Sequence, residues 1–513
     1  MERFSRHYPD WKAPSADGQM IIWPPPDQIL AQTLQNQQRL SDAESVRIQG
    51  IPLPQLRRRM RQLIGQPDDQ PLLGTGHQTE LYHPGVWAKN ALISAAAARL
   101  QGRAVHLAVD TDAPKHLNLR WPPGESIPIT DDPRITSAAW SGLLAPPTPQ
   151  HLNYIASQFE HASRGWDFSP VLPRVLSSLR RLAMESLNLP AALCTATHEL
   201  DWQLGLRHHV LLAGPVWSSD VFLVFVHDLL ANADVAASHY NHALGAYRAE
   251  HGISSKMRPM PDLFVGPDAV EAPFWLDDLH SGRRSRPSVF RSDRGWVLEL
   301  VGGEQFVFEK AVDGWEASGR LQRWLSMARH RISPRALTLT TFVRLMMVDQ
   351  FVHGIGGGQY DQVTDRLIAW HYGLEPPHFS VTTATMYFPA ALGRQRVCLP
   401  CVKQELHRLR HSVLGQRKRE LVAQIEALPR RSRERAQKYY QMHSELAAAA
   451  RASGALQRWQ QRLLEAQQRE KEERILFDRE LFYALQPPER LQQMIQQYAR
   501  QFDAPADAEA VMT

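Results

Sequence analysis

The stretch 74–90 concentrates residue types that bind and transform small molecules. Glycine lets the backbone approach a ligand closely, and the first N–H groups of a helix can bind an anion. We therefore predict an anion-binding loop whose binding residues are Gly76, Gln78, Gly85 and Lys89. Histidine titrates near neutral pH, so His77 and His83 are catalytic candidates. The alternative is a tight turn whose histidines only satisfy backbone groups.

Two carboxylates follow the next apolar run, 104–109. Asp110 and Asp112 at the end of a strand could bind an amine, a ribose hydroxyl or Mg²⁺. The alternative is that Asp112 caps a helix, which Pro114 just downstream supports. We predict Asp110 and Asp112 as catalytic residues and His116 as a substrate-binding residue.

A second glycine-rich segment, 353–361, precedes another expected helix. Its glycines extend the predicted anion site, and arginine suits the recognition of carboxylate or phosphate. The residues expected to bind the anion here are Gly356, Gly357 and Gly358. Those expected to bind the substrate are Arg335, Arg344, Tyr360 and Asp361. The alternative is a loop that packs under the C-terminal helical segment.

Four further residues have a spacing similar to a Cys₂His₂ zinc site: Cys398, Cys401, His407 and His411. The interval between Cys401 and His407 is shorter than such sites usually have. The alternative is a pair of thiols at a domain junction, followed by two surface histidines. We therefore predict no metal centre and keep the four residues only as a zinc candidate.

The first motifs need a strand–helix–strand unit to position them. The apolar run 71–74 predicts a buried strand, 86–100 a helix that Gly102 ends, and 104–109 a second buried strand. Two such strands joined by a helix indicate a parallel sheet with a right-handed crossover. Ligands of such sheets bind outside the carboxyl ends of the strands, which is where the motifs lie.

The remaining pattern predicts an α/β protein with a Rossmann-like parallel-sheet core, helical insertions and a long antiparallel coiled-coil arm. Helices are expected over 28–64, with a break near Pro52 and Pro54, over 337–352 and over 359–372, and a hairpin is expected over 288–300. We divide the chain into an N-terminal helical segment 1–65, the core 66–400 and the arm 401–485. Residues 486–513 are expected to form a C-terminal helix and a disordered tail.

Composition narrows the class of protein. The 513 residues exceed one usual core, and only three of them are cysteines, which indicates a reducing compartment. The N-terminus has no apolar signal core, and no run approaches the roughly 20 apolar residues of a membrane helix. We therefore expect a cytoplasmic protein with a small-molecule substrate and no membrane partner.

Basic charge is concentrated in one segment. Residues 403–474 contain 17 Lys/Arg and 9 Asp/Glu, whereas the whole chain carries a net charge of only +5. A solvated helical face explains this balance, and we do not expect nucleic acid as a partner. The alternative function is a non-catalytic scaffold whose basic coiled coil contacts nucleic acid or a protein.

Taken together, the motifs resemble the cysteine-adding enzymes of bacillithiol biosynthesis, the BshC-like family. That family has Gly-x-Gln, then Leu, then Gly-Pro and a lysine at spacings similar to those of Gly76, Gln78 and Lys89. An acidic run follows its second strand, as Asp110 and Asp112 do here. Arg344, the segment 356–360 and the closing coiled coil are also similar, and the order of these features agrees over 70–485.

The resemblance implies a ligase that joins L-cysteine to the amine of glucosaminyl-malate. It also implies ATP or ADP, with Mg²⁺, to activate the carboxylate, and a homodimer formed through the coiled coil. His83 stands where the family has glycine or threonine, and Gly358-Gln359 replaces its Pro-Gly-Glu. The chain therefore resembles a divergent member, and another substrate on the same fold is the alternative.

Overall fold

The computed structural model describes residues 6–186, 188–310 and 312–502, and these form two compact units. We call residues 1–120, 126–386 and 479–513 the body, as far as they are described, and residues 121–125 and 387–478 the arm. The longer segment of the second unit runs from Tyr387 to Asp478, and the division of the chain expected from the sequence stays a prediction.

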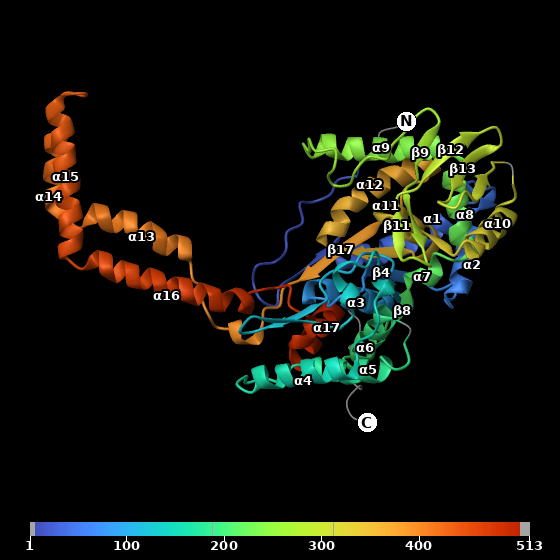
Figure 1. Ribbon diagram of the computed structural model, residues 1–513, viewed down its shortest axis with the longest axis horizontal. Helices are drawn as coiled ribbons and strands as arrows, with labels where there is room; N and C mark the ends of the chain where they lie inside the picture. The colour runs from blue at the N-terminus through green and yellow to red at the C-terminus, as the bar shows by residue number, and fades with distance from the viewer. Residues whose placement is uncertain (1–5, 187, 311, 503–513) are drawn as a thin grey trace. The chain divides into compact units, whose positions relative to one another are not determined.

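The body is built on a mixed sheet of six strands, most of them parallel (Figure 1). Its order is β1-β17-β16-β4-β5-β8, and only β1 runs antiparallel to its neighbour. The strands are β1 (Met20–Trp23), β4 (Leu72–Gln78), β5 (Arg103–Val109), β8 (His209–Leu212), β16 (Gln350–His353) and β17 (Phe379–Ala384).

The strand order reverses between β4 and β16. The chain adds β5 and β8 on one side of β4, and later adds β16 and β17 on the other side. After β4 and β16 the chain enters α3 (Pro84–Arg99) and α12 (Ile355–Tyr372), respectively. Right-handed crossovers in opposite directions place these two helices on opposite faces of the sheet.

Neighbouring side chains of β17 confirm that two faces are covered. α12 packs on the face of Val381, because a Cβ at Gly358 would lie 2.4 Å from the Val381 Cγ2 atom. On the other face the Thr382 hydroxyl bonds to Tyr498 of α17, a helix that packs against α3. Successive strand residues point to opposite faces, so the sheet is sandwiched between helices.

Other helices complete the body: α1 (Pro26–Ser41), α2 (Leu53–Leu63), α4 (Pro149–Ser163), α5 (Leu172–Leu182), α6 (Leu189–Gln203), α7 (Ala213–Val216), α8 (Asp220–Ala231), α9 (Ala233–Glu250), α10 (Gly314–Met327), α11 (Ala336–Phe342) and α17 (Pro488–Gln501). The largest apolar core joins α8, α9 and α12 to side chains of β5. Among the described residues no single helix is long and apolar enough to cross a membrane. The bent pair α8–α9 passes that test only as a pair, and most of α8 is buried in the core.

Among the described residues, short strands form four smaller sheets. They are β2 (Arg47–Ile48), β3 (Ile51–Pro52), β6 (Asn118–Trp121), β7 (Glu125–Pro128), β9 (Ala269–Glu271), β10 (Phe274–Asp278), β11 (Arg283–Ser285), β12 (Ser288–Ser292), β13 (Gly295–Glu299), β14 (Gln305–Phe308) and β15 (His330–Pro334). The pairing of β12 with β13 confirms the expected hairpin. The break expected near Pro52 is present, because the β2–β3 pair divides the segment 28–64 into α1 and α2.

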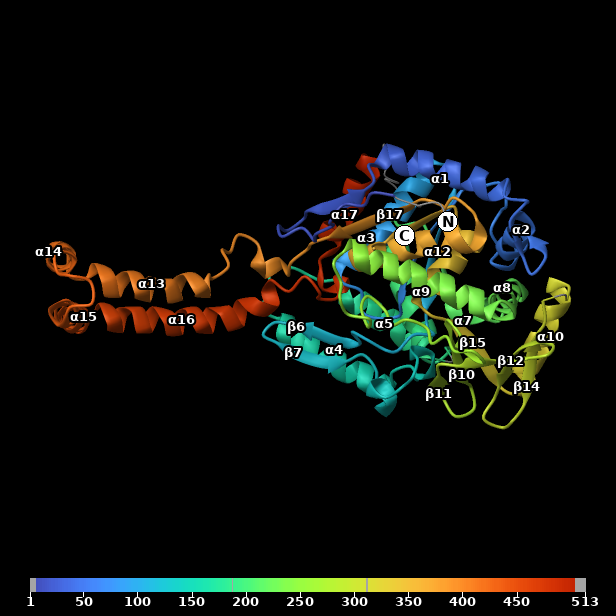
Figure 2. The ribbon, with the colours of Figure 1, turned by 90° about the horizontal axis from the view of Figure 1, so that it is seen from above.

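The arm contains four helices: α13 (Leu399–Ser412), α14 (Gly415–Glu426), α15 (Arg433–Ala452) and α16 (Ala455–Leu476). α13 lies beside α16 and α14 beside α15 (Figure 2). Leu421 and Ile425 of α14 pack on Met442 and Leu446 of α15 in a small apolar core. The arm is thus helical, as expected, and coiled-coil packing remains a prediction.

The structure corrects three expected elements. The segment 74–78 is not a loop, because β4 continues through Gln78 and pairs with β5 up to Val109. The helix expected over 337–352 ends in a π-helical turn at Met347, and β16 follows. The glycines 356–358 lie inside the first turns of α12 and do not precede it. That helix ends at Gly373 as expected, and the expected disordered tail, 503–513, lies outside the described residues.

Asp349 fixes the start of the two strands that flank the reversal. Its backbone N–H donates to the Leu72 carbonyl, and its carboxylate accepts the Leu72 N–H, both at 2.8 Å. The same carboxylate pairs with Arg57 and Arg61 of α2, and all three side chains are buried. One charged group therefore joins α2, β4 and β16.

We predict that Asp349→Ala lowers the free energy of unfolding by about 3–5 kcal/mol, because it leaves two buried guanidinium groups without their partner. Urea unfolding followed by fluorescence measures this loss. Asp293→Ala, in an exposed turn, serves as the control and should change stability by less than about 0.5 kcal/mol. Equal effects of the two substitutions would contradict the role of Asp349 in joining α2, β4 and β16.

Candidate functional site

A cavity of about 720 Å³ opens in the body at the carboxyl ends of four parallel strands. β4 contributes Gly76 to Gln78, β5 is followed by Thr111 and Asp112, β16 contributes His353, and β17 contributes Thr383. This is the point at which the strand order reverses, where open parallel sheets bind their ligands. Its volume is in the range of small-molecule sites.

Two helices begin at this cavity, one on each side of the reversal. α3 is capped by His83, whose Nδ1 atom accepts the Gly85 N–H at 3.0 Å. α12 begins after Gly354 without a capping side chain, and Gly356 and Gly357 line the cavity. The first N–H groups of α12 are therefore the better anion donors, because the N-cap residue Gly354 has no side chain to cap them. For His83, the structure thus agrees with the alternative of a histidine that satisfies a backbone group.

Lys89 lies one turn inside α3 and reaches back to the strand. Its side chain is 2% exposed, and its ammonium donates to the Gly76 carbonyl at 2.8 Å. Burial lowers the pKa of Lys89 to about 7, against the attraction of Glu80. The amine can thus gain or lose a proton near neutral pH, as an acid–base group must.

Glu80 supplies the matching acid. Burial raises the pKa of Glu80 to about 7, although Lys89 opposes this rise. Its Oε1 atom lies 3.3 Å from Nδ1 of His77, and its Oε2 atom has no hydrogen-bond partner among the described residues. Burial and the charge of Lys89 hold the pKa of His77 well below its usual value, so His77 is neutral. Glu80 and Lys89 thus both change protonation near neutral pH, whereas His77 beside Glu80 stays neutral.

The two predicted carboxylates separate. Asp112 lines the cavity and accepts a hydrogen bond from the Gln78 amide. Asp110 points away from the cavity, and its Oδ1 atom accepts the Gly214 N–H of α7 at 2.7 Å. Burial raises the pKa of Asp110 despite this bond. Asp112 thus remains a site residue, whereas Asp110 fastens α7 to the end of β5.

His353 is a site residue that our sequence predictions passed over. Its Nε2 atom bonds to the Asp361 carboxylate at 2.8 Å, and Arg344 binds the same oxygen at 2.7 Å. Burial opposes ionisation of Asp361, but Arg344 and His353 together hold its pKa below the usual range. The carboxylate favours the proton on Nε2, which leaves the Nδ1 lone pair beside the first turn of α12.

Arg344 and Asp361 were predicted to bind substrate, but both side chains are about 1% exposed and neither lines the cavity. Asp361 holds the His353 ring by a hydrogen bond, and Arg344 holds Asp361. Gly357 permits this arrangement, because a Cβ there would lie 2.7 Å from Nδ1 of His353. Gly358 packs on β17 and does not line the cavity.

The other predicted residues lie in different surroundings. Tyr360 is 42% exposed and lines the cavity. Arg335 is buried, bonds to Glu271 at 2.7 Å and does not line the cavity. His116 is exposed, and its carbonyl accepts the Leu81 N–H. Arg335 thus belongs to an internal ion pair, and His116 shapes the loop after β4.

One wall of the cavity comes from the chain that follows the arm. Arg479 donates to the Thr383 hydroxyl at 3.0 Å, and Glu480 lines the cavity beside it. A Cβ at Gly85 would lie 2.5 Å from the Thr383 hydroxyl and 2.6 Å from Arg479, which explains the glycine. No local sequence signal marks Arg479 or Glu480, because they are distant in sequence from every predicted motif.

The structure does not support the zinc candidate, but it contains a turn suited to a phosphate group. Cys398 and Cys401 form a disulfide, so their sulfur atoms cannot bind a metal as thiolates while this bond is intact, and the His411 side chain lies outside the described residues. No group of three or more His, Cys, Asp or Glu side chains suited to a metal occurs among the described residues. The first turn of α12, where Gly354 offers no capping side chain and Gly356 and Gly357 line the cavity, fits a phosphate group.

The sequence matches no protein-family model and no curated protein. The resemblance to the cysteine-adding enzymes therefore rests on the motif residues alone.

The pKa of Glu80 leads to a pH prediction. The unfolded carboxyl releases its proton near pH 4.5, whereas folded Glu80 retains it up to about pH 7. The stabilisation from this group is therefore complete below pH 4.5 and is lost as the pH rises through 7. Glu80→Gln removes this dependence. We expect the wild-type stability, measured relative to the variant, to fall by about 3 kcal/mol over that window and to stay constant above it.

Urea unfolding at a series of pH values measures the difference. Glu304→Gln, at an exposed position, is the matched control and should leave the pH profile of the wild type unchanged. If the difference in unfolding free energy between the wild type and Glu80→Gln does not vary with pH, the raised pKa assigned to Glu80 is wrong.

Proposed function

We propose that the protein is a carbon–nitrogen ligase that joins a cysteine-like amino acid to the amine of a small sugar conjugate. The observation that carries this proposal is the convergence of His77, Lys89 and Asp112 with the start of α12 in one cavity. Amide formation needs an anion site, an amine site and a base, and the cavity offers a group for each. The motif resemblance supplies the substrate class, and it also supports a Rossmann-like description of the core.

The start of α12 is suited to the acidic partner. Its uncapped N–H groups and the lining residues Gly356 and Gly357 would bind a carboxylate or a phosphate. ATP, when bound, would supply the phosphoryl group that turns a carboxylate into an acylating agent.

The opposite side of the cavity is suited to the amine. Asp112 would bind the ammonium form, and its bond from Gln78 fixes the carboxylate. An amine must lose a proton to become a nucleophile, and Lys89 with a pKa of about 7 can accept it. His353 offers a second base through Nδ1, while Asp361 holds its ring.

The scaffold alternative receives less support. Several arginines of the arm form ion pairs within it, including Arg417 with Glu445 and Arg462 with Glu405. Exposed apolar side chains of the arm, Tyr439, Tyr440 and Leu464, favour contact with a second copy over contact with a polyanion. We therefore retain the homodimer as part of the proposal.

A thermal-shift series with ATP, ADP, cysteine and glucosaminyl-malate tests the proposal. A ligand at 100 times its Kd should add roughly 2.7 kcal/mol of apparent stability to the wild type. Lys89→Met should abolish the shift for the ligand that contacts the ammonium, while Lys256→Met, at an exposed position, should retain it. If none of the four ligands stabilises the wild type, the proposed substrate class is wrong.

A pair of glycine substitutions tests the role of His353. Gly357→Ala forces the His353 ring to move, whereas Gly356→Ala meets no atom within 4 Å. We expect Gly357→Ala to weaken ligand binding or lower turnover by about tenfold or more and Gly356→Ala to change either by less than threefold. Calorimetric titration of both variants measures the affinities. Equal behaviour of the two would show that the His353 ring has no part in the site.

A further inference from the structure

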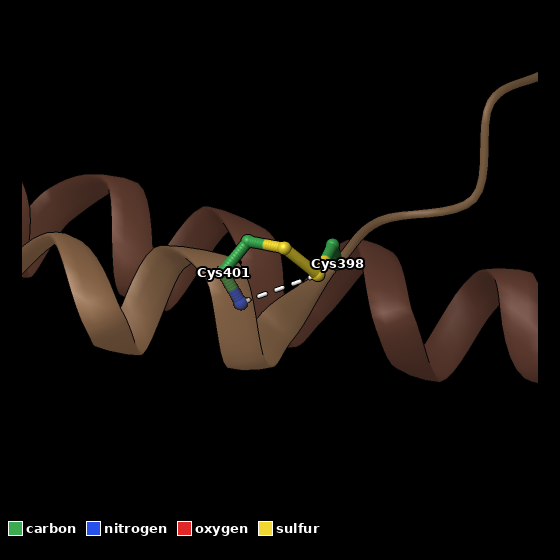
Figure 3. The surroundings of a disulfide bond; sticks show 2 residues. All are labelled: Cys398 and Cys401. Atoms are coloured by element: carbon green, nitrogen blue, oxygen red, sulfur yellow. Dashed lines mark hydrogen bonds between the residues drawn. A yellow bond between two sulfur atoms is a disulfide. The ribbon is translucent and has the colours of Figure 1, made fainter.

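Cys398 and Cys401 form a disulfide across the first turn of α13, apart from the proposed ligase chemistry (Figure 3). Both residues are exposed, and Leu399 and Pro400 separate them. Cys398 caps the helix, and its Sγ atom accepts the Cys401 N–H at 3.2 Å. We propose that this pair is a reversible redox site that exchanges with low-molecular-weight thiols and disulfides.

The position of Cys398 favours a reactive sulfur. In the reduced protein, a thiolate there would receive the Cys401 N–H and lie at the positive end of α13, a helix of 14 residues. The Cys-x-x-Cys spacing keeps a second sulfur within bonding reach, as the disulfide itself demonstrates. Exposure gives a small reagent access to both sulfurs.

A purely structural disulfide explains the pair less well. A cross-link between residues three apart closes a very short loop, and the stabilisation from a disulfide grows with loop length. The low cysteine content of the chain led us to expect a reducing compartment, where disulfides are usually transient, catalytic or sensory. An exposed disulfide that forms and breaks agrees with the short loop and with that expectation.

The reaction balances with a small disulfide as oxidant. The Cys398 thiolate attacks one sulfur of the small disulfide, forms a mixed disulfide and releases one small thiolate. Cys401 then loses its proton and attacks the Cys398 sulfur, which expels the second small thiolate. The chain loses two electrons and two protons, and the small disulfide is reduced to two thiols. The reverse sequence reduces the protein.

The third cysteine makes the reaction easy to follow. Cys194 is buried in the body, and burial raises the pKa of its thiol far above the usual value. It should therefore stay unmodified in the native protein. Every native thiol that appears on reduction then belongs to Cys398 or Cys401.

The test uses the full-length protein, reduced with a phosphine that is then removed. Oxidised glutathione is added, and alkylation with intact-mass measurement follows the thiols. We expect the wild type to lose two alkylatable thiols and to retain no glutathione. Cys401→Ser should hold one glutathione on Cys398, because the resolving sulfur is missing. Cys398→Ser should acquire its adduct at least about tenfold more slowly.

Cys194→Ser is the control and should behave as the wild type, and circular dichroism should show equal helix content in all variants. Two results would overturn the proposal. One is a reduced wild type that keeps both thiols in excess oxidised glutathione. The other is equal adduct formation on the two single variants, which would remove the distinct role of Cys398.

Discussion

The pairing of β4 with β16 is the constraint on which the site depends. These strands are adjacent in the sheet, but roughly 270 residues separate them in sequence, and Asp349 sets their register by bonding both backbone groups of Leu72. Because the strand order reverses there, the helices that follow leave toward opposite faces and open a gap between their first turns. The cavity occupies that gap. A shift in this register would separate Gly76 from His353.

Burial gives the cavity its chemical character. Lys89 and Glu80 are ordinary charged residues in sequence, but removal from water brings their pKa values together near 7. The free energy of proton transfer between the two groups is therefore small at neutral pH. Burial and the charge of Lys89 also keep His77, which lies beside Glu80, in its neutral form. Two common residues, Lys89 and Glu80, can therefore exchange protons near neutral pH because burial shifts both of their pKa values toward 7.

Sequence patterns predicted the elements whose signals are local. The β4–α3–β5 unit and the end of α12 at Gly373 carry strong glycine and apolar signals, and these predictions are confirmed. We did not predict β16, because its few apolar residues continue the helical pattern of the preceding segment. The direction of Asp110 depends on strand alternation at a turn, and Arg479 reaches the cavity only through tertiary folding. A single sequence contains no local pattern that predicts the direction of the Asp110 side chain or the position of Arg479.

The central claim is that the cavity at the strand reversal joins an amino acid to an amine. The most direct measurement is mass spectrometry of the products formed from ATP, cysteine and glucosaminyl-malate by the wild type and by Lys89→Met. The account predicts an amide product from the wild type, formed with loss of one water between the substrates, and a loss of at least about a hundredfold in the variant. Equal product from both proteins, or none from the wild type, would contradict it.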